Sequence, residues 1–130
     1  MRATKYFMMA VLTMALVAGL GVFQAADDAK PKYDTEEIMK KAHKAPKGKL
    51  SLYQQVVKGK ANEEQKKQLL EYYVELGKNK PEKGELSDWK KRTDALVHAA
   101  KDEVAGKEGA AKTLQKAADC KACHNAHKED

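Results

Sequence analysis

The chain has little of what multi-cysteine sites and large aromatic cores require. Its 130 residues include two cysteines, three prolines, one tryptophan and two phenylalanines, and aromatic residues make up 6% of the sequence. Because there is no second cysteine pair, a closed structural zinc site with four ligands is disfavoured. No segment alternates apolar and polar residues as strands do, so we expect an all-α chain.

Only one long apolar run is present, and it lies at the N-terminus. Arg2 and Lys5 begin the chain, residues 6–23 are an apolar run of 18 positions, and a pair of alanines follows closely. This order is typical of a secretory signal peptide, so we predict a cleaved signal over residues 1–26 and a periplasmic protein. Since 18 residues is near the lower limit for a membrane helix, an uncleaved anchor is the alternative, and only an anchored chain would contact a membrane.

Residues 27–130 have the size of one small domain with a thin core. They contain one Ile, one Met, eight Leu, five Val, one Trp, four Tyr and no Phe. Small domains of this kind often need a covalent or metal-based supplement to their core. The basic residues are interleaved with acidic ones, so the net charge of +6 does not indicate nucleic-acid binding.

Glycine and proline divide the domain into amphipathic segments of helical period. We expect a first helix from Asp34 or Thr35 to Pro46, and others over about 50–58, 62–77, 87–106 and from 108 into the C-terminal segment. Asn62 and Gln65 predict a capping box at the start of the third helix, and Ser87 is expected to cap the fourth. Amphipathic helices joined by short turns predict a four-helix bundle.

Cys120-Lys121-Ala122-Cys123-His124 is a C-x-x-C-H motif, which is the attachment signature of c-type haem. Two thiols at this spacing form thioether links with the haem vinyl groups, and the adjacent imidazole ligates the iron. We therefore predict one covalently bound haem c, attached at Cys120 and Cys123 and ligated by His124. A thioredoxin-like dithiol leaves His124 without a role, and an exported helical adaptor with a disulfide is a further alternative.

The position of the motif restricts the ligand on the opposite haem face. Six residues follow His124, none of them Met, and His127 and Lys128 stay on the same side of the helix as His124. A second axial ligand must therefore come from upstream. Met39 is the only Met after residue 26 and lies on the apolar stripe of the first helix, with His43 one turn later. Met39, His43 and an open distal site all remain candidates at this point.

With these residues the chain resembles the class II c-type cytochromes, in which a four-helix bundle carries C-x-x-C-H near the C-terminus. That family usually continues with two variable residues, an aromatic residue and a basic residue. Here Asn125 and Ala126 are the variable pair, His127 replaces the aromatic residue, and Lys128 matches the basic position. The resemblance covers the architecture of residues 27–130, and its specific motifs are confined to the C-terminal segment.

The resemblance implies an electron carrier and not an enzyme. In the Met-ligated members the distal ligand is a Met on the first helix, about a dozen residues into the exported protein, and Met39 fits that place. We therefore expect a periplasmic monohaem cytochrome with His124 and Met39 as axial ligands. A five-coordinate, gas-binding protein like cytochrome c′ is the alternative.

Two kinds of partner are also expected. Class II relatives often form dimers through their first helices, which makes a homodimer one expectation. Lysines near the first helix and the haem motif lead us to expect acidic redox partner proteins. These lysines are Lys40, Lys41, Lys44, Lys47, Lys49, Lys121 and Lys128.

Overall fold

The computed structural model describes residues 30–129, and within this range every regular element is a helix. The all-α prediction is therefore confirmed for the described residues. The predicted signal peptide over residues 1–26 lies outside them. Within the described range, no helix combines the length and apolar character needed to span a bilayer.

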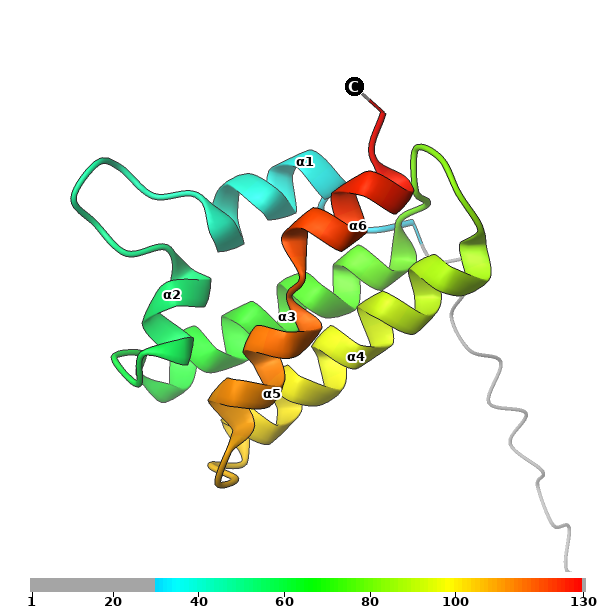
Figure 1. Ribbon diagram of the computed structural model, residues 1–130. Coiled ribbons are helices and arrows are strands. Elements are labelled where there is room, and N and C mark those ends of the chain that lie inside the picture. The colour runs from blue at the N-terminus through cyan, green and yellow to red at the C-terminus, as the bar shows by residue number, and fades with distance from the viewer. Residues whose placement is uncertain (1–29, 130) are drawn as a thin grey trace, which may run out of the picture.

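Two long helices form the base of the fold. α3 (Glu63–Lys78) and α4 (Leu86–Val104) run side by side in opposite directions (Figure 1). The predicted capping box at the start of α3 is confirmed, because Asn62 accepts a hydrogen bond from the Gln65 amide at 2.8 Å and Gln65 accepts one from the Asn62 amide at 2.9 Å. Gly77 does not end α3 as the sequence suggested. A Cβ at Gly77 would lie 3.4 Å from the Thr93 hydroxyl, so this glycine lets α3 and α4 approach closely.

The expected cap of α4 is wrong. The N-cap residue is Glu85, no side-chain hydrogen bond caps the helix, and Ser87 lies within its first turn. The end of α4 agrees with the sequence, because Gly106 follows it with a φ of +69°, a left-handed conformation that favours glycine.

The N-terminal part of the domain is a short helix that widens. Asp34 caps α1 (Thr35–Ile38) by accepting a hydrogen bond from the Glu37 amide at 2.7 Å, so the helix begins where the sequence predicts. The helix continues as the π-helical turn η1 (Met39–His43) and stops before Pro46. α2 (Leu52–Val57) then begins with a capping box formed by Ser51 and Gln54.

The C-terminal helix is broken where the sequence predicted continuity. α5 (Ala110–Ala117) ends at Ala118, whose ψ of 52° leaves the helical region. α6 (Cys120–His127) then starts afresh, with the Asp119 carboxylate accepting a hydrogen bond from the Ala122 amide at 3.0 Å. The C-x-x-C-H motif therefore occupies its own short helix.

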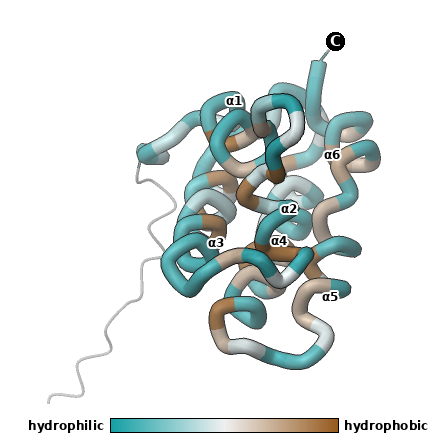
Figure 2. The backbone as a smooth tube through the Cα atoms, turned by 90° about the vertical axis from the view of Figure 1, so that its left-hand side faces the viewer, coloured by the Kyte–Doolittle hydropathy of each residue, from teal (hydrophilic) through white to brown (hydrophobic). Residues whose placement is uncertain are grey.

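The core is small and lies between the helices. Hydrophobic stretches of α2, α3, α4 and α5 turn toward the middle of the molecule, while the outer turns are hydrophilic (Figure 2). The largest fully buried side chains are few, in agreement with the thin core expected from composition. They are Tyr73, Ile38, Leu69, Leu114, Val56 and Thr93.

Candidate haem site

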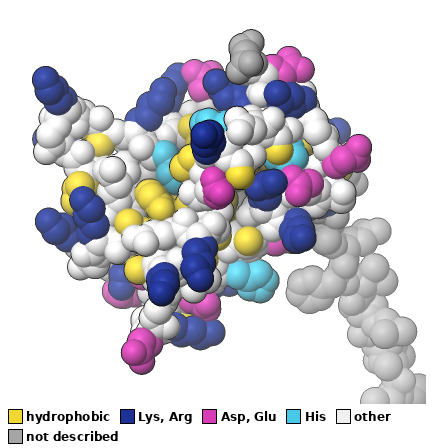
Figure 3. Space-filling view, in the orientation of Figure 1, with side chains coloured by type: hydrophobic (Ala, Val, Ile, Leu, Met, Phe, Trp, Pro, Cys, Tyr) yellow, Lys and Arg dark blue, Asp and Glu magenta, His cyan; other side chains and the backbone are white. Residues whose placement is uncertain are grey.

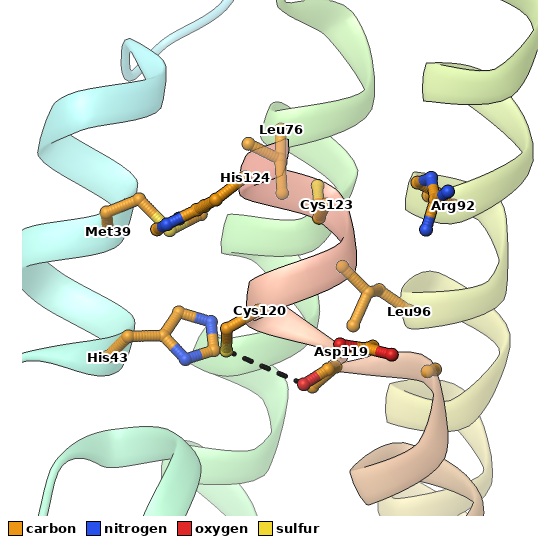
Figure 4. A pocket seen from close by; sticks show the side chains of 11 residues that line it. Met39, His43, Leu76, Arg92, Leu96, Asp119, Cys120, Cys123 and His124 are labelled. Carbon is orange, nitrogen blue, oxygen red and sulfur yellow. Dashed lines mark hydrogen bonds between the residues drawn. The ribbon is translucent and has the colours of Figure 1, made fainter. Parts of the chain in front are cut away.

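The C-x-x-C-H motif and both candidate distal ligands line one cavity. Met39 and His43 face it from η1, and Cys120, Cys123 and His124 face it from α6 (Figure 4). Its remaining lining comes from α3, α4 and the α5–α6 corner: Leu76, Arg92, Leu96, Ala117, Ala118 and Asp119. This cavity is narrow, at about 50 Å³.

A second and larger cavity adjoins the first. It has a volume of about 450 Å³, within the range of about 300–1,000 Å³ that is usual for ligand sites. Met39, Leu76, Cys123 and His124 belong to the lining of both cavities. Figure 3 shows hydrophobic side chains in the opening between the α1–α2 segment and α6, with Lys and Arg side chains on its borders.

Met39 and His124 approach each other from opposite walls. Figure 4 shows the Met39 side chain extending from η1 and the His124 ring extending from α6 toward it. Residues four apart on a helix share one face, so Met39 and His43 are both presented to the cavity from the π-helical turn η1. Such turns occur often at functional sites.

His43 is already held by two tyrosines. Its Nε2 shares a hydrogen bond with the Tyr73 hydroxyl at 3.3 Å, and its ring centroid lies 5.0 Å from that of Tyr53. Burial lowers the pKa of His43, with a smaller contribution from nearby His124, so the imidazole is kept neutral. Burial also raises the pKa of Tyr73, which keeps its hydroxyl protonated. His43 is thus a packed, hydrogen-bonded side chain rather than a free one.

The two cysteines are free thiols at the mouth of the cavity. Cys120 is exposed and Cys123 is partly buried. Burial raises the pKa of Cys123, and the nearby Arg92 guanidinium offsets part of that effect, so the thiol form dominates at neutral pH. A haem needs both thiols accessible from one side, together with an imidazole and apolar walls. These residues meet that requirement, with Leu76 and Leu96 as the apolar walls.

Residues 30–129 contain no cluster of three or more His, Cys, Asp or Glu side chains arranged to hold a metal ion directly. A haem iron does not need such a cluster, because the porphyrin nitrogens supply four of its ligands and the protein adds the axial ones.

His127 has a role that the sequence did not reveal. It is buried, its Nδ1 lies 3.1 Å from the Lys83 carbonyl oxygen, and its Nε2 lies 2.8 Å from the Asp88 carboxylate, both at hydrogen-bond distance. The hydrogen bond from Arg92, and to a lesser extent the one from His127, holds the pKa of the Asp88 carboxyl below its usual value. Asp88 is therefore ionised and accepts hydrogen bonds as a carboxylate. Both ring nitrogens thus face hydrogen-bond acceptors on other segments. His127 therefore fastens the last turn of α6 to α4 and to the preceding loop.

Replacing His127 with alanine is expected to destabilise the domain by about 2 kcal/mol, because two buried hydrogen bonds and the edge-on contact with Trp89 are lost. Urea unfolding measures the change. His98→Ala is the matched control, since His98 is exposed on α4 and lines neither cavity. Equal stability of the two variants would show that His127 does not fasten α6.

The motif and Met39, which the sequence singles out as haem-binding residues, line one cavity, but the sequence does not reveal the other residues of its lining. Leu76 and Arg92, which line the cavity, and Tyr53, which packs on His43, are not singled out by the sequence. The sequence does carry a signal for the contact between Tyr73 and His43, because a tyrosine in the core needs a hydrogen-bond partner for its hydroxyl.

Comparison with models of known protein families finds no match to this chain. No curated protein matches it. No solved structure matches it either.

Proposed function

We propose that the chain is a periplasmic monohaem c-type cytochrome that carries single electrons and is not an enzyme. The observation that supports this most directly is the shared cavity. Its lining combines the two thiols and the imidazole of a C-x-x-C-H motif with a methionine extending from the opposite wall. Export is supported by the sequence of residues 1–26.

In this proposal Cys120 and Cys123 hold the haem, and His124 and Met39 bind its iron. When bound, the haem supplies an iron that alternates between the ferric and ferrous states, and a methionine thioether favours the ferrous state relative to a second imidazole. The protein's part is to hold both ligands fixed and to exclude water. Leu76 and Leu96 provide apolar walls, and the fastening of α6 by His127 limits movement of the proximal side.

Met39 is the better candidate than His43 for the distal ligand. Met39 lines both cavities and has no hydrogen-bonding partner to give up, whereas His43 lines only the narrow one. The Nε2 atom of His43 already shares a hydrogen bond with the Tyr73 hydroxyl, and the His43 ring packs against Tyr53. Ligation by His43 would break this hydrogen bond and move a packed ring.

We further propose that the helices form a four-helix bundle around the haem. α3 and α4 supply two of the four positions, α5 with α6 the third, and α1 with η1 the fourth. The packing of α3 on α4, of α4 on α5, and of α1 on α3 supports this arrangement.

Absorption spectra of the purified, matured protein test the assignment of axial ligands. Six-coordinate, low-spin iron with a weak Met–iron charge-transfer band is expected. High-spin ferrous iron that readily binds carbon monoxide would contradict it and would favour the gas-binding alternative.

Acidic redox partners are the partners that the surface favours. Lys40 and Lys41 are paired with Glu36 and Glu37, but the loop after η1 and the motif helix carry exposed lysines as well. We expect the rate of electron transfer to an acidic partner to fall as salt is added, because screening weakens long-range attraction. A rate that is independent of ionic strength would contradict steering by these lysines, which include Lys47, Lys49 and Lys121.

A further inference from the structure

Three exposed lysines lie on the rim of the larger cavity. Lys44 follows η1, Lys80 follows α3, and Lys128 follows α6, so three separate elements each contribute one ammonium group to the same rim. All three are exposed, and none lines the narrow cavity. Arg92, the cation that lines the narrow cavity, is already paired with Asp88 at 2.7 Å, so the unpaired positive charge of the described lining comes from these three lysines.

The acidic side chains on the same rim already have partners. Glu36 is paired with Lys40 at 2.5 Å, and the Glu82 carboxylate accepts a hydrogen bond from the Glu129 amide at 2.8 Å. Among the residues that the structure describes, Lys44, Lys80 and Lys128 take part in no ion pair. The rim thus offers three ammonium groups to an anionic ligand.

The cysteines fix the opposite end of the site. Cys120 lines only the narrow cavity, and Cys123 lies where the two cavities meet. In a haem, the vinyl groups that form the thioethers and the two propionates lie on opposite edges of the porphyrin. A haem attached at Cys120 and Cys123 would therefore have its carboxylates on the side of the larger cavity, where Lys44, Lys80 and Lys128 would hold them.

We infer that Lys44, Lys80 and Lys128 bind the two haem propionates. This inference rests on the proposed attachment of haem at Cys120 and Cys123. The ammonium groups stabilise the carboxylate form of the propionates and hold the haem edge between η1, α3 and α6. A negative propionate favours ferric iron and so lowers the reduction potential. Pairing with lysine makes this lowering smaller.

The pH dependence of the reduction potential tests this assignment, because it reports the pKa values of the propionates independently of electron-transfer activity. Lys44→Gln, Lys80→Gln and Lys128→Gln are each expected to raise a propionate pKa by about one unit, which is a tenfold change in proton affinity. Lys80→Arg keeps the charge and is expected to retain the original profile. Lys67→Gln is the matched control, because Lys67 is exposed near the other end of α3 and lines neither cavity.

Different results would contradict the lysine assignment and the attachment of haem. If the unsubstituted protein carries covalent haem and the three glutamine variants keep the pH profile of Lys67→Gln, the lysine assignment is wrong while the cytochrome proposal stands. If the unsubstituted protein carries no covalent haem after expression with a c-type maturation system, both are wrong.

Discussion

Replacing both Cys120 and Cys123 with serine is expected to give a chain without covalent haem, with markedly lower helicity and a loss of cooperative unfolding. The physical reason is the thin core: few side chains are fully buried, and the walls of the haem site are apolar and face a cavity. Without a haem to cover them, these walls are exposed to water. The expected loss is on the order of several kcal/mol, a large part of the about 5–15 kcal/mol that stabilises small domains.

Far-ultraviolet circular dichroism and thermal melting measure this loss directly. The Cys120→Ser variant alone is an informative control, because Cys123 still offers one thioether link and His124 still offers a ligand, so an intermediate stability is expected. A double variant with the helicity and melting curve of the unsubstituted protein would show that the fold does not depend on haem.

Replacing Met39 with alanine is expected to convert six-coordinate, low-spin haem into five-coordinate haem. The side chain that extends toward His124 is removed, and the Met39 position has no neighbour that can take its place without rearrangement. The ferrous variant should be high-spin and bind carbon monoxide stoichiometrically, where the unsubstituted protein binds little. Its reduction potential should fall, because a thioether ligand favours ferrous iron.

His43→Ala is the matched control for Met39→Ala, since it removes the other candidate ligand from the same turn. We expect this variant to stay six-coordinate and low-spin and to lose only the contacts with Tyr73 and Tyr53. The reverse pattern, with low-spin iron in Met39→Ala and high-spin iron in His43→Ala, would assign the distal position to His43.

Local signals in the sequence predicted much of the helical framework. Asn62 is predicted as a cap because its hydrogen bond reaches only three residues along the chain, and the start of the first helix at Asp34 or Thr35 is predicted on the same local scale. The prediction of Ser87 as a cap is wrong because residue type alone does not fix where a helix starts. Ser87 is the second residue of a helix that begins at Leu86 without a side-chain cap. Asp119 carried a readable capping signal, but the alanines before it are good helix formers and concealed the break.

The site could be predicted only in part, because its walls come from segments far apart in the sequence. The C-x-x-C-H motif and Met39 could be named from residue type and position. The π-helical turn that presents Met39 beside His43 has no simple sequence signature. The burial of His127 could not be foreseen either, since its partners Lys83 and Asp88 lie 44 and 39 residues away.

The central claim is that Cys120 and Cys123 hold a haem by two thioether links. The alkaline pyridine haemochrome spectrum of protein from a host that matures c-type cytochromes tests it most directly, because the absorption maximum of the reduced complex reports how many vinyl groups have been saturated. The account predicts one haem per chain with both vinyl groups saturated, and no haem in the Cys120→Ser, Cys123→Ser protein. A matured protein with no covalent haem would contradict it.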